Sequence, residues 1–228
     1  NAQEREGVTT TDLIGDDGLN GSTVTDDFAD TGYTRFFERT SAASPMASGV
    51  ISLMLEANPN LGWRDVKEIL IRSATQIDPF DPDWVINGAG QHFNHKFGAG
   101  LINAEGAVTL ATNWANLGPQ ASLVQEYTNV SYAIPDNDSE GTTMVFDFRR
   151  FPALRVEHAV VTASILHPHR GYVALTLVSA QGTRSRLAEL HPDINANYES
   201  WRFSSVMHWG ESSQGEWMLQ FADLRALD

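Results

Sequence analysis

A serine surrounded by small residues stands at the start of a long apolar stretch. Ser41 follows Thr40 and precedes Ala42 and Ala43, in the run FERTSAASPMASGV of residues 37–50. A serine hydroxyl becomes a nucleophile when a base accepts its proton and hydrogen-bond donors hold the oxyanion. The first turn of a helix supplies such donors, because its N–H groups have no partners within the helix. Ser41 is therefore a candidate nucleophile.

Ser41 also has a purely structural interpretation. Serine is a preferred N-cap residue, because its side chain accepts a hydrogen bond from the first helical turn. The almost continuously apolar residues 50–55 predict a mostly buried helix that ends before Pro59. Pro45 would lie in the first turn, where a missing N–H costs nothing, and Gly49 suggests close packing against another backbone. The residues alone leave nucleophile and cap as open alternatives.

Two further helices are predicted before residue 118. Asn103 is a suitable N-cap for a helix that runs to about Trp114. Apolar spacing predicts another helix over residues 63–75 whose solvent face carries Arg64, Lys67, Glu68 and Arg72.

Residues 1–40 are rich in Thr, Asp and Gly, and they predict loop with one strand near residues 8–13.

Beyond Leu117 the pattern changes to alternation with period two. The alternating segments are VSYAI, TTMVFDF, EHAVVTASILH, YVALTLVS, WRFSSVMHW and EWMLQFADL, and turn residues separate them. Several short strands of this kind predict an antiparallel sandwich or barrel. We therefore expect an α/β region over residues 1–117 and an all-β sandwich over residues 118–228.

The composition argues against several classes of protein and site. With 15 basic and 29 acidic residues, the formal charge is 15 − 29 = −14, which argues against a nucleic-acid partner because phosphate binding requires clustered Lys and Arg. The chain has no cysteine, which rules out disulfides and thiolate metal sites. No apolar run of about 18 residues predicts a membrane span. The polar, abrupt start NAQEREGVTTTDL predicts a fragment of a longer protein.

Several motifs resemble the subtilisin superfamily in its kexin and furin-like branch. TSAASP and the following MASGVISLMLEANPNLGWRDVKEIL resemble the nucleophile motif and the two helices behind it. GVTTTDL resembles the strand before that motif, and HKFGAGLINAEGAV resembles the closing turn and helix. HPHRGYVALTLVSAQGTRSRL and WGESSQGEWMLQFADL resemble the P domain that follows such catalytic domains. The resemblance covers almost the whole chain.

This resemblance implies a serine endopeptidase that acts on a peptide or protein substrate. Residues 1–117 would be the C-terminal part of a subtilisin-like catalytic domain, and residues 118–228 a jelly-roll-like P domain packed on it. Ser41 falls on the nucleophile and Thr40 on the threonine that supports the oxyanion region. The family also implies a secreted, periplasmic or extracellular location and calcium binding, although no residue here can be matched to a calcium ligand and no other cofactor is evident.

Two features depart from the family pattern. The family has Gly where this chain has Arg39, and arginine costs roughly 1–2 kcal/mol if this position needs a positive φ. In subtilisin the catalytic Asp and His precede the Ser, and the family's oxyanion Asn also precedes it. All seven histidines here follow Ser41, namely His92, His95, His158, His167, His169, His191 and His208. We therefore expect that this chain alone does not hydrolyse peptides.

Other candidate sites have simpler interpretations. His92 and His95 have the spacing of metal ligands, but they lie in a Gly-flanked loop. DNDSEGTTMVFD, residues 136–147, spaces its acidic residues like a calcium loop, but it precedes a predicted strand instead of a helix. The alternation around three tryptophans favours core packing over ligand stacking for Trp201, Trp209 and Trp217.

Two alternatives to the protease hypothesis stay open. Arg39 favours a catalytically inactive subtilase homologue, in which the acidic β module would serve interaction or adhesion. The other alternative is a non-enzymatic binding module with Ser41 as a helix cap.

Overall fold

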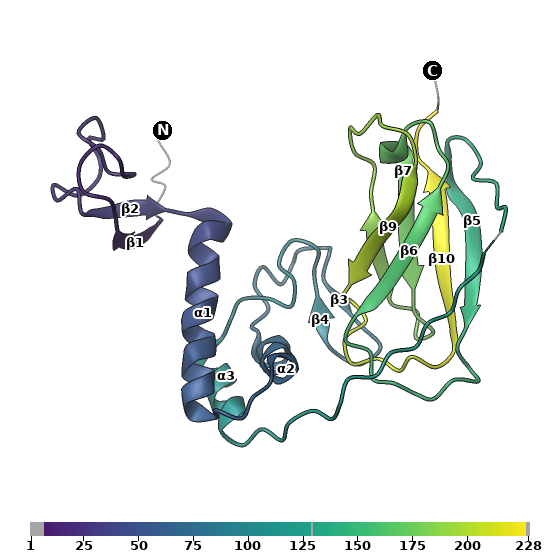
Figure 1. Cartoon of the computed structure of the whole chain (residues 1–228), viewed down its shortest axis with the longest axis horizontal. Helices are drawn as coiled ribbons and strands as arrows, with labels where there is room; N and C mark the ends of the chain where they lie inside the picture. The colour runs from purple at the N-terminus through teal and green to yellow at the C-terminus, as the bar shows by residue number, and fades with distance from the viewer. Residues whose placement is uncertain (1–6, 129, 227–228) are drawn as a thin grey trace. The chain divides into compact units, whose positions relative to one another are not determined.

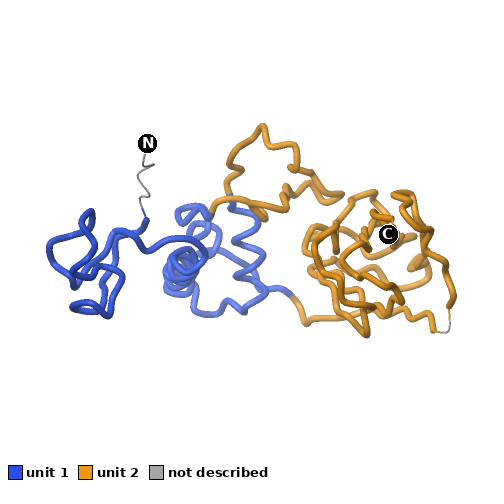
Figure 2. The backbone as a smooth tube through the Cα atoms, turned by 90° about the horizontal axis from the view of Figure 1, so that it is seen from above, with its two compact units in different colours: residues 1–74, 102–117 blue, residues 75–101, 118–228 orange. Residues whose placement is uncertain are grey.

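The structure, a computed structural model, describes residues 7–128 and 130–226. It contains two compact units, each built from two stretches of sequence (Figure 2). The first unit consists of residues 1–74 and 102–117, and the second of residues 75–101 and 118–228. Across the described residues, none of the helices has both the length and the apolar character needed to cross a membrane.

The described residues of the first unit form two short strands and three helices (Figure 1). Strands β1 and β2 form an antiparallel pair, in which Thr10 lies opposite Thr34. Helices α1, α2 and α3 share a small core of six buried residues: Met54, Leu61, Val66, Ile69, Ala107 and Ala111. The bounds are β1 (Val8–Thr11), β2 (Tyr33–Phe37), α1 (Arg39–Ala57), α2 (Trp63–Ser73) and α3 (Ala104–Thr112).

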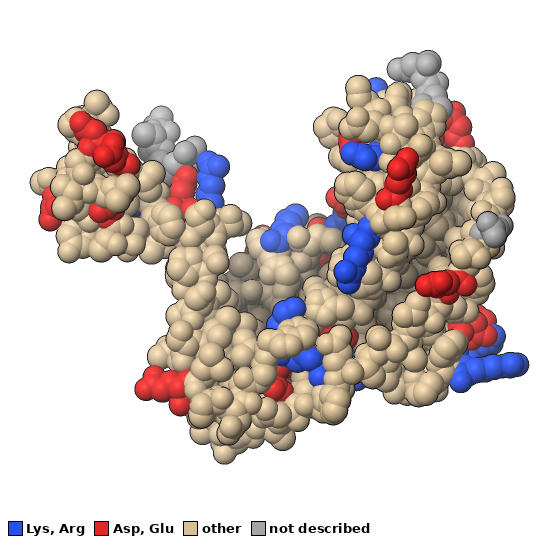
Figure 3. Space-filling view, in the orientation of Figure 1, with Lys and Arg blue, Asp and Glu red and all other residues tan. Residues whose placement is uncertain are grey.

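The prediction that α1 is mostly buried is wrong for this structure. Of its 19 residues only Ala42 and Met54 are buried, while Leu53 is 50% exposed. A Cβ added at Gly49 would meet nothing within 4 Å, so the close backbone packing predicted there is also absent from the described residues. The reason is that α1 has one substantial packing partner here, helix α3. Its visible face is uncharged between its two ends (Figure 3).

Helix α2 has the predicted amphipathic character with one exception. Val66 and Ile69 are buried as expected, but Glu68, predicted on the solvent face, is fully buried. Arg72, one turn later, pairs with the Glu68 carboxylate through its guanidinium. An ion pair at this spacing lets a carboxylate enter an otherwise apolar face, which the hydrophobic pattern does not reveal.

Residues 75–101 contain a short antiparallel hairpin of β3 (Val85–Ile86) and β4 (His92–Phe93). The segment is closed at its base, where Thr75 and Leu101 exchange two backbone hydrogen bonds of 2.9 Å. Gly100 makes this closure possible: its φ is +121°, and an added Cβ would lie 2.4 Å from the carbonyl oxygen of Thr75.

The rest of the second unit is the predicted antiparallel β-rich domain. A four-stranded sheet has the order β5-β10-β7-β8, and β6 pairs with β9. Ten buried residues form its core: Met144, Ile165, Val173, Leu175, Leu177, Tyr198, Phe203, Trp217, Leu219 and Phe221. The elements are β5 (Asp138–Asp147), β6 (Ala159–Ile165), the 3-10 turn η1 (Arg170–Tyr172), β7 (Val173–Val178), β8 (Arg184–Ala188), β9 (Tyr198–Ser205) and β10 (Glu216–Asp223).

Three details of the β-rich domain differ from the sequence prediction. VSYAI, residues 130–134, forms no strand, whereas the polar RSRLA forms β8. Trp209 and Trp217 are buried as predicted, but Trp201 is 44% exposed on β9. Arg170 lies over the Trp201 ring at 5.1 Å, so this indole packs against a cation instead of the core.

Candidate active site

Ser41 lies in the first turn of α1 and is not its cap. The N-cap residue is Glu38, which makes no side-chain cap hydrogen bond, and Ser41 is the third residue inside the helix. Ser41 and Thr40 are both exposed, and nothing in the described part of the chain hydrogen-bonds to their hydroxyls. The capping interpretation of Ser41 therefore does not hold, and its hydroxyl is open to solvent.

The backbone around Ser41 is rich in uncommitted polar groups. Outside the helix, no described residue accepts a hydrogen bond from the first N–H groups of α1. Pro45 lies in the second turn, not in the first turn as predicted, because the helix begins at Arg39. It cannot donate the usual hydrogen bond to the carbonyl of Ser41, four residues earlier. The N-terminal turn thus offers donors and partial positive charge where an oxyanion would form.

Arg39 has φ +66°, in the left-handed region that glycine adopts without strain. Position 39 therefore has the positive φ at which arginine is expected to be unfavourable, and the residue carries a cost of roughly 1–2 kcal/mol. The Arg39 guanidinium is exposed and pairs with Glu38 at 3.2 Å. Two charged side chains therefore precede Thr40 and Ser41, where the family pattern has glycine just before the threonine.

None of the histidines lies in the same unit as Ser41. All seven belong to residues 75–101 or 118–228. His92 and His95 do not form a joint metal site: His92 packs against Trp84, while the Nδ1 of His95 accepts a hydrogen bond from Arg186 at 2.9 Å. The first unit therefore holds the exposed Ser41 hydroxyl at a helix N-terminus, and its sequence contains no histidine.

The acidic stretch 136–147 has strand geometry over most of its length. Asp138 to Asp147 form β5, and the Asp147 carboxylate binds Arg149, whose hydrogen bonds hold the Asp147 pKa at about 2. Within residues 7–128 and 130–226 there is no group of three or more His, Cys, Asp or Glu side chains placed to share a metal ion. These residues do not fit the calcium loop that their spacing suggested.

Sequence reasoning missed a buried polar anchor in the second unit. The Asn87 side chain donates to the carbonyls of Met207 and Trp209 at 3.0 and 2.9 Å. The next N–H, that of Gly88, donates to the Glu211 carboxylate at 2.7 Å. These contacts fasten the β3–β4 segment to the loop between β9 and β10. Glu211 belongs to the WGE motif of the sequence, but its partner lies 123 residues away, beyond the reach of local patterns.

The environment of Glu211 fixes its charge. Burial by itself raises the carboxyl pKa, but the neighbouring His208 and Ser179 side chains, together with hydrogen bonds from the Thr183 hydroxyl and the Gly88 N–H, lower the pKa to about 2. Glu211 is 2% exposed and His208 is fully buried beside it, with Nδ1 3.6 Å from the carboxylate. The anchor is therefore an ionised carboxylate inside the domain.

Two family models match the chain. The subtilase family model matches residues 10–100, which include Ser41. The model of the proprotein convertase P-domain matches residues 156–228. The subtilase match extends through the β3–β4 segment, which belongs structurally to the second unit.

Curated relatives are endoproteases of the kexin type. The chain is 37% identical over 195 residues to PC3-like endoprotease variant B of Hydra vulgaris, an overlap of 83% of this chain and 28% of that protein. It is 38% identical over 187 residues to Protease KEX1 of Kluyveromyces lactis, covering 79% and 25%. Against human proprotein convertase subtilisin/kexin type 6 it is 36% identical over 191 residues, covering 81% and 20%. The chain thus spans about a quarter of the length of these relatives.

A solved structure supports the same assignment. The serine protease of Aeromonas sobria superposes with a TM-score of 0.81 at 28% identity, over 95% of this chain and 44% of that protein. The same protease in complex with its chaperone ORF2 gives the same values. The chain therefore belongs to the subtilase family, in its kexin and proprotein convertase branch, with an α/β subtilisin-like part followed by a β-rich P domain.

Proposed function

We propose that Ser41 is the nucleophile of a serine endopeptidase of the kexin type. The observation that carries this proposal is the exposed Ser41 in the first turn of α1, inside TSAASP and within the matched subtilase residues. The Ser41 oxygen would attack the scissile carbonyl and form an acyl-enzyme. The free N–H groups of the helix terminus, supported by Thr40, would stabilise the oxyanion.

No histidine precedes Ser41 in these 228 residues to accept its proton. Residues 1–40 contain no histidine, and by family order the base and its orienting aspartate precede the serine. We expect a chain limited to these 228 residues to lack acyl-enzyme turnover. A burst of product from an acyl substrate that depends on Ser41 would contradict this expectation.

The natural substrate would be a peptide or protein, and the protein would act outside the cytoplasm, as the resemblance implies. The P domain would begin near residue 118 and pack on the catalytic part. The anchor between Asn87, within the matched subtilase residues, and the loop at Met207 and Trp209 supports this packing. Calcium is implied by the family, but no described cluster fits it, so no step here depends on calcium.

Labelling with a fluorophosphonate probe tests the nucleophile in the full-length protein. We expect covalent labelling at Ser41 and its loss in Ser41→Ala. Ser44→Ala is the matched control, because it removes a neighbouring exposed hydroxyl from the same helix and should leave labelling intact. Equal labelling of the wild type and Ser41→Ala would overturn the assignment.

One observation favours a second candidate, a catalytically inactive homologue. Arg39, in a backbone conformation suited to glycine, places a charged side chain two residues before Ser41. If the arginine blocks the site, the wild type stays unlabelled and Arg39→Gly restores labelling. If the enzyme is active, both proteins are labelled.

A further inference from the structure

A cavity of about 300 Å³ lies within the second unit, between the segment 75–101 and the outer face of the four-stranded sheet. Asp83 and His95 line it from the segment, and Thr176, Arg184 and Arg186 line it from β7 and β8. Alternate residues of a strand share one face, so Arg184 and Arg186 project from the same side of β8. The cavity is large enough for a small ligand group.

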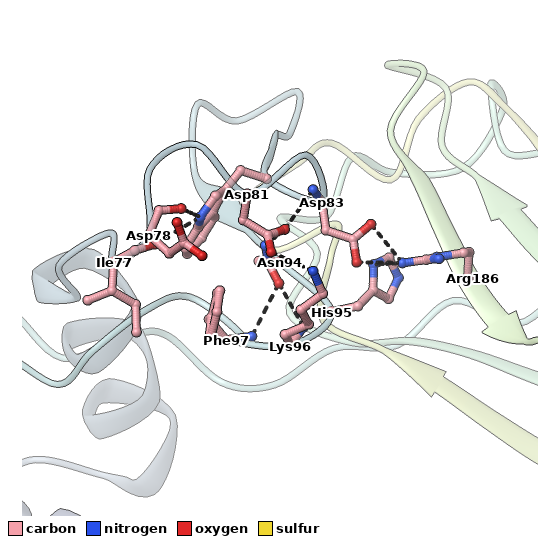
Figure 4. Close-up of polar contacts among 10 residues, drawn as sticks. Ile77, Asp78, Asp81, Asp83, Asn94, His95, Lys96, Phe97 and Arg186 are labelled. Carbon is pink, nitrogen blue, oxygen red and sulfur yellow. Dashed lines mark hydrogen bonds and ion pairs between the residues drawn. The ribbon is translucent and has the colours of Figure 1, made fainter. Parts of the chain in front are cut away.

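One wall of this cavity already binds a carboxylate. Both oxygens of Asp83 lie 2.9 Å from Nη2 of Arg186 (Figure 4). The Glu189 carboxylate pairs with the other terminal nitrogen of Arg186 at 2.7 Å. Two carboxylates of the chain itself therefore offset the charge of Arg186. The Asp83–Arg186 pair also shows that the geometry of this sheet face suits a carboxylate.

His95 is held as a neutral hydrogen-bond donor. Its Nδ1 accepts a hydrogen bond from Arg186 at 2.9 Å, so the ring proton lies on Nε2 (Figure 4). Burial, followed by the positive charge of Arg186, lowers the His95 pKa below its usual value. The imidazole therefore offers an N–H without adding charge.

Arg184 brings a second positive charge to the cavity. Its Nη2 donates to the Gln220 side chain at 2.9 Å, and in the described portion of the chain no carboxylate lies within ion-pair distance of it. Thr176, on the neighbouring strand, likewise has a hydroxyl without a hydrogen-bond partner among the described residues. The cavity thus gathers one guanidinium without a direct ion-pair partner, one imidazole N–H and one hydroxyl, beside the two carboxylates that pair with Arg186.

We propose that this cavity binds an oxyanion, a carboxylate or sulfate group, on Arg184, with His95 and Thr176 donating neutral hydrogen bonds. Charge-assisted hydrogen bonds to a guanidinium are the strongest contacts available to such a group. Because the whole chain carries a formal charge of −14, a non-specific attraction for anions does not account for binding here. The site is separate from Ser41, and its test does not depend on peptidase activity.

Isothermal titration calorimetry of the 228-residue chain at constant ionic strength tests the proposal with two probes. One is sodium sulfate, and the other is a short acetylated and amidated peptide with two Glu residues in a neutral sequence. We expect saturable binding of at least one probe in the millimolar range. Arg184→Gln should weaken it roughly tenfold, and the isosteric Thr176→Val should weaken it by a smaller factor.

Arg202→Gln is the matched control, because Arg202 is an exposed arginine on β9 that does not line the cavity. It should leave binding unchanged, and circular dichroism should show that all three variants are folded. Sulfate binding alone assigns the site to a free anion, and peptide binding alone assigns it to a protein carboxylate. Absence of saturable binding by both probes, or equal weakening by Arg184→Gln and Arg202→Gln, overturns the proposal.

Discussion

Helix α1 and the β-rich domain are both rich in apolar residues, but they bury these residues to different extents. The domain buries ten large or medium side chains between its own strands, and Leu219 is 2% exposed. Helix α1 carries no charge between its ends yet buries two of its 19 residues. An apolar sequence therefore predicts that a segment needs packing partners, and only the fold shows whether its own unit provides them. The β-rich domain buries its apolar side chains between its own strands, whereas the described residues leave most of α1 unburied.

The largest expected effect is a pair of matched leucine truncations. Leu219→Ala removes a side chain from the closed core and should lower the free energy of unfolding of the second unit by about 3 kcal/mol. Leu53→Ala removes a half-exposed side chain from α1 and should cost less than about 1 kcal/mol. Urea denaturation, followed with hydrogen exchange to assign each change to its unit, measures both. Similar costs at the two positions would erase the contrast between the two regions.

Next comes the charged anchor of the second unit. Glu211→Gln should cost about 2 kcal/mol, because the Gly88 N–H and the Thr183 hydroxyl lose a buried charged acceptor. Glu216→Gln, at the start of strand β10 that follows this loop, is the control, since its exposed ion pair with Arg149 is worth less than about 1 kcal/mol. Equal costs for the two variants would show that the buried charge does not stabilise the domain.

The same carboxylate predicts a direction of pH dependence. The folded-state pKa of Glu211 is about 2, below its usual 4.5. The ionised Glu211 carboxylate therefore stabilises the fold at pH values above 4.5, and this contribution is lost as the pH falls towards 2. Denaturation at several pH values should show this loss in the wild type and a weaker loss in Glu211→Gln. An unchanged profile would assign the acid sensitivity to other groups.

Within the first unit, helix α3 depends on a cap. The Asn103 side chain accepts a hydrogen bond from the Gly106 N–H at 2.9 Å. Asn103→Ala should therefore lower stability by about 1 kcal/mol. Asn113→Ala, at the exposed C-terminal end of the same helix, should cost less. Hydrogen exchange of the α3 amides measures both, and identical exchange would remove the role assigned to the cap.

The smallest expected change has the opposite sign. Arg39→Gly relieves a left-handed backbone strain of roughly 1–2 kcal/mol, but glycine also gains freedom in the unfolded chain, so the stability of the first unit should rise by up to about 1 kcal/mol. Lys67→Gly, inside α2, should instead lower it by about 1 kcal/mol. Thermal unfolding of the two variants compares the signs. A loss of stability in both would mean that Arg39 makes contacts that outweigh its strain.

Sequence patterns located elements well where local chemistry is decisive. The Asn103 cap, the Pro59 stop and the apolar spacing of residues 63–75 place all three helices to within a few residues. Sequence patterns failed where a pairing partner elsewhere in the chain decides whether a strand forms. RSRLA forms a strand because β7 pairs with it, although its first three residues are polar and show no apolar alternation. Conversely, residues 130–134 have a strand-like pattern and no ladder.

The candidate site shows the same division. Ser41 and its place in the first helical turn follow from the motif, and so does the strain at Arg39 once the family glycine is considered. The Glu211 anchor and the Arg184 cavity could not be predicted, because their members come from segments about 90 to 120 residues apart. No local period encodes such a distance.

The reach of the Asn87 side chain also constrains the order of events during translation. Its acceptor at Met207 is 120 residues further along the polypeptide. At a synthesis rate of about 5–20 residues per second, the amide waits roughly 6–24 s before its acceptor even exists. The β3–β4 segment therefore acquires its final bonds after the helices on either side of it have left the ribosome.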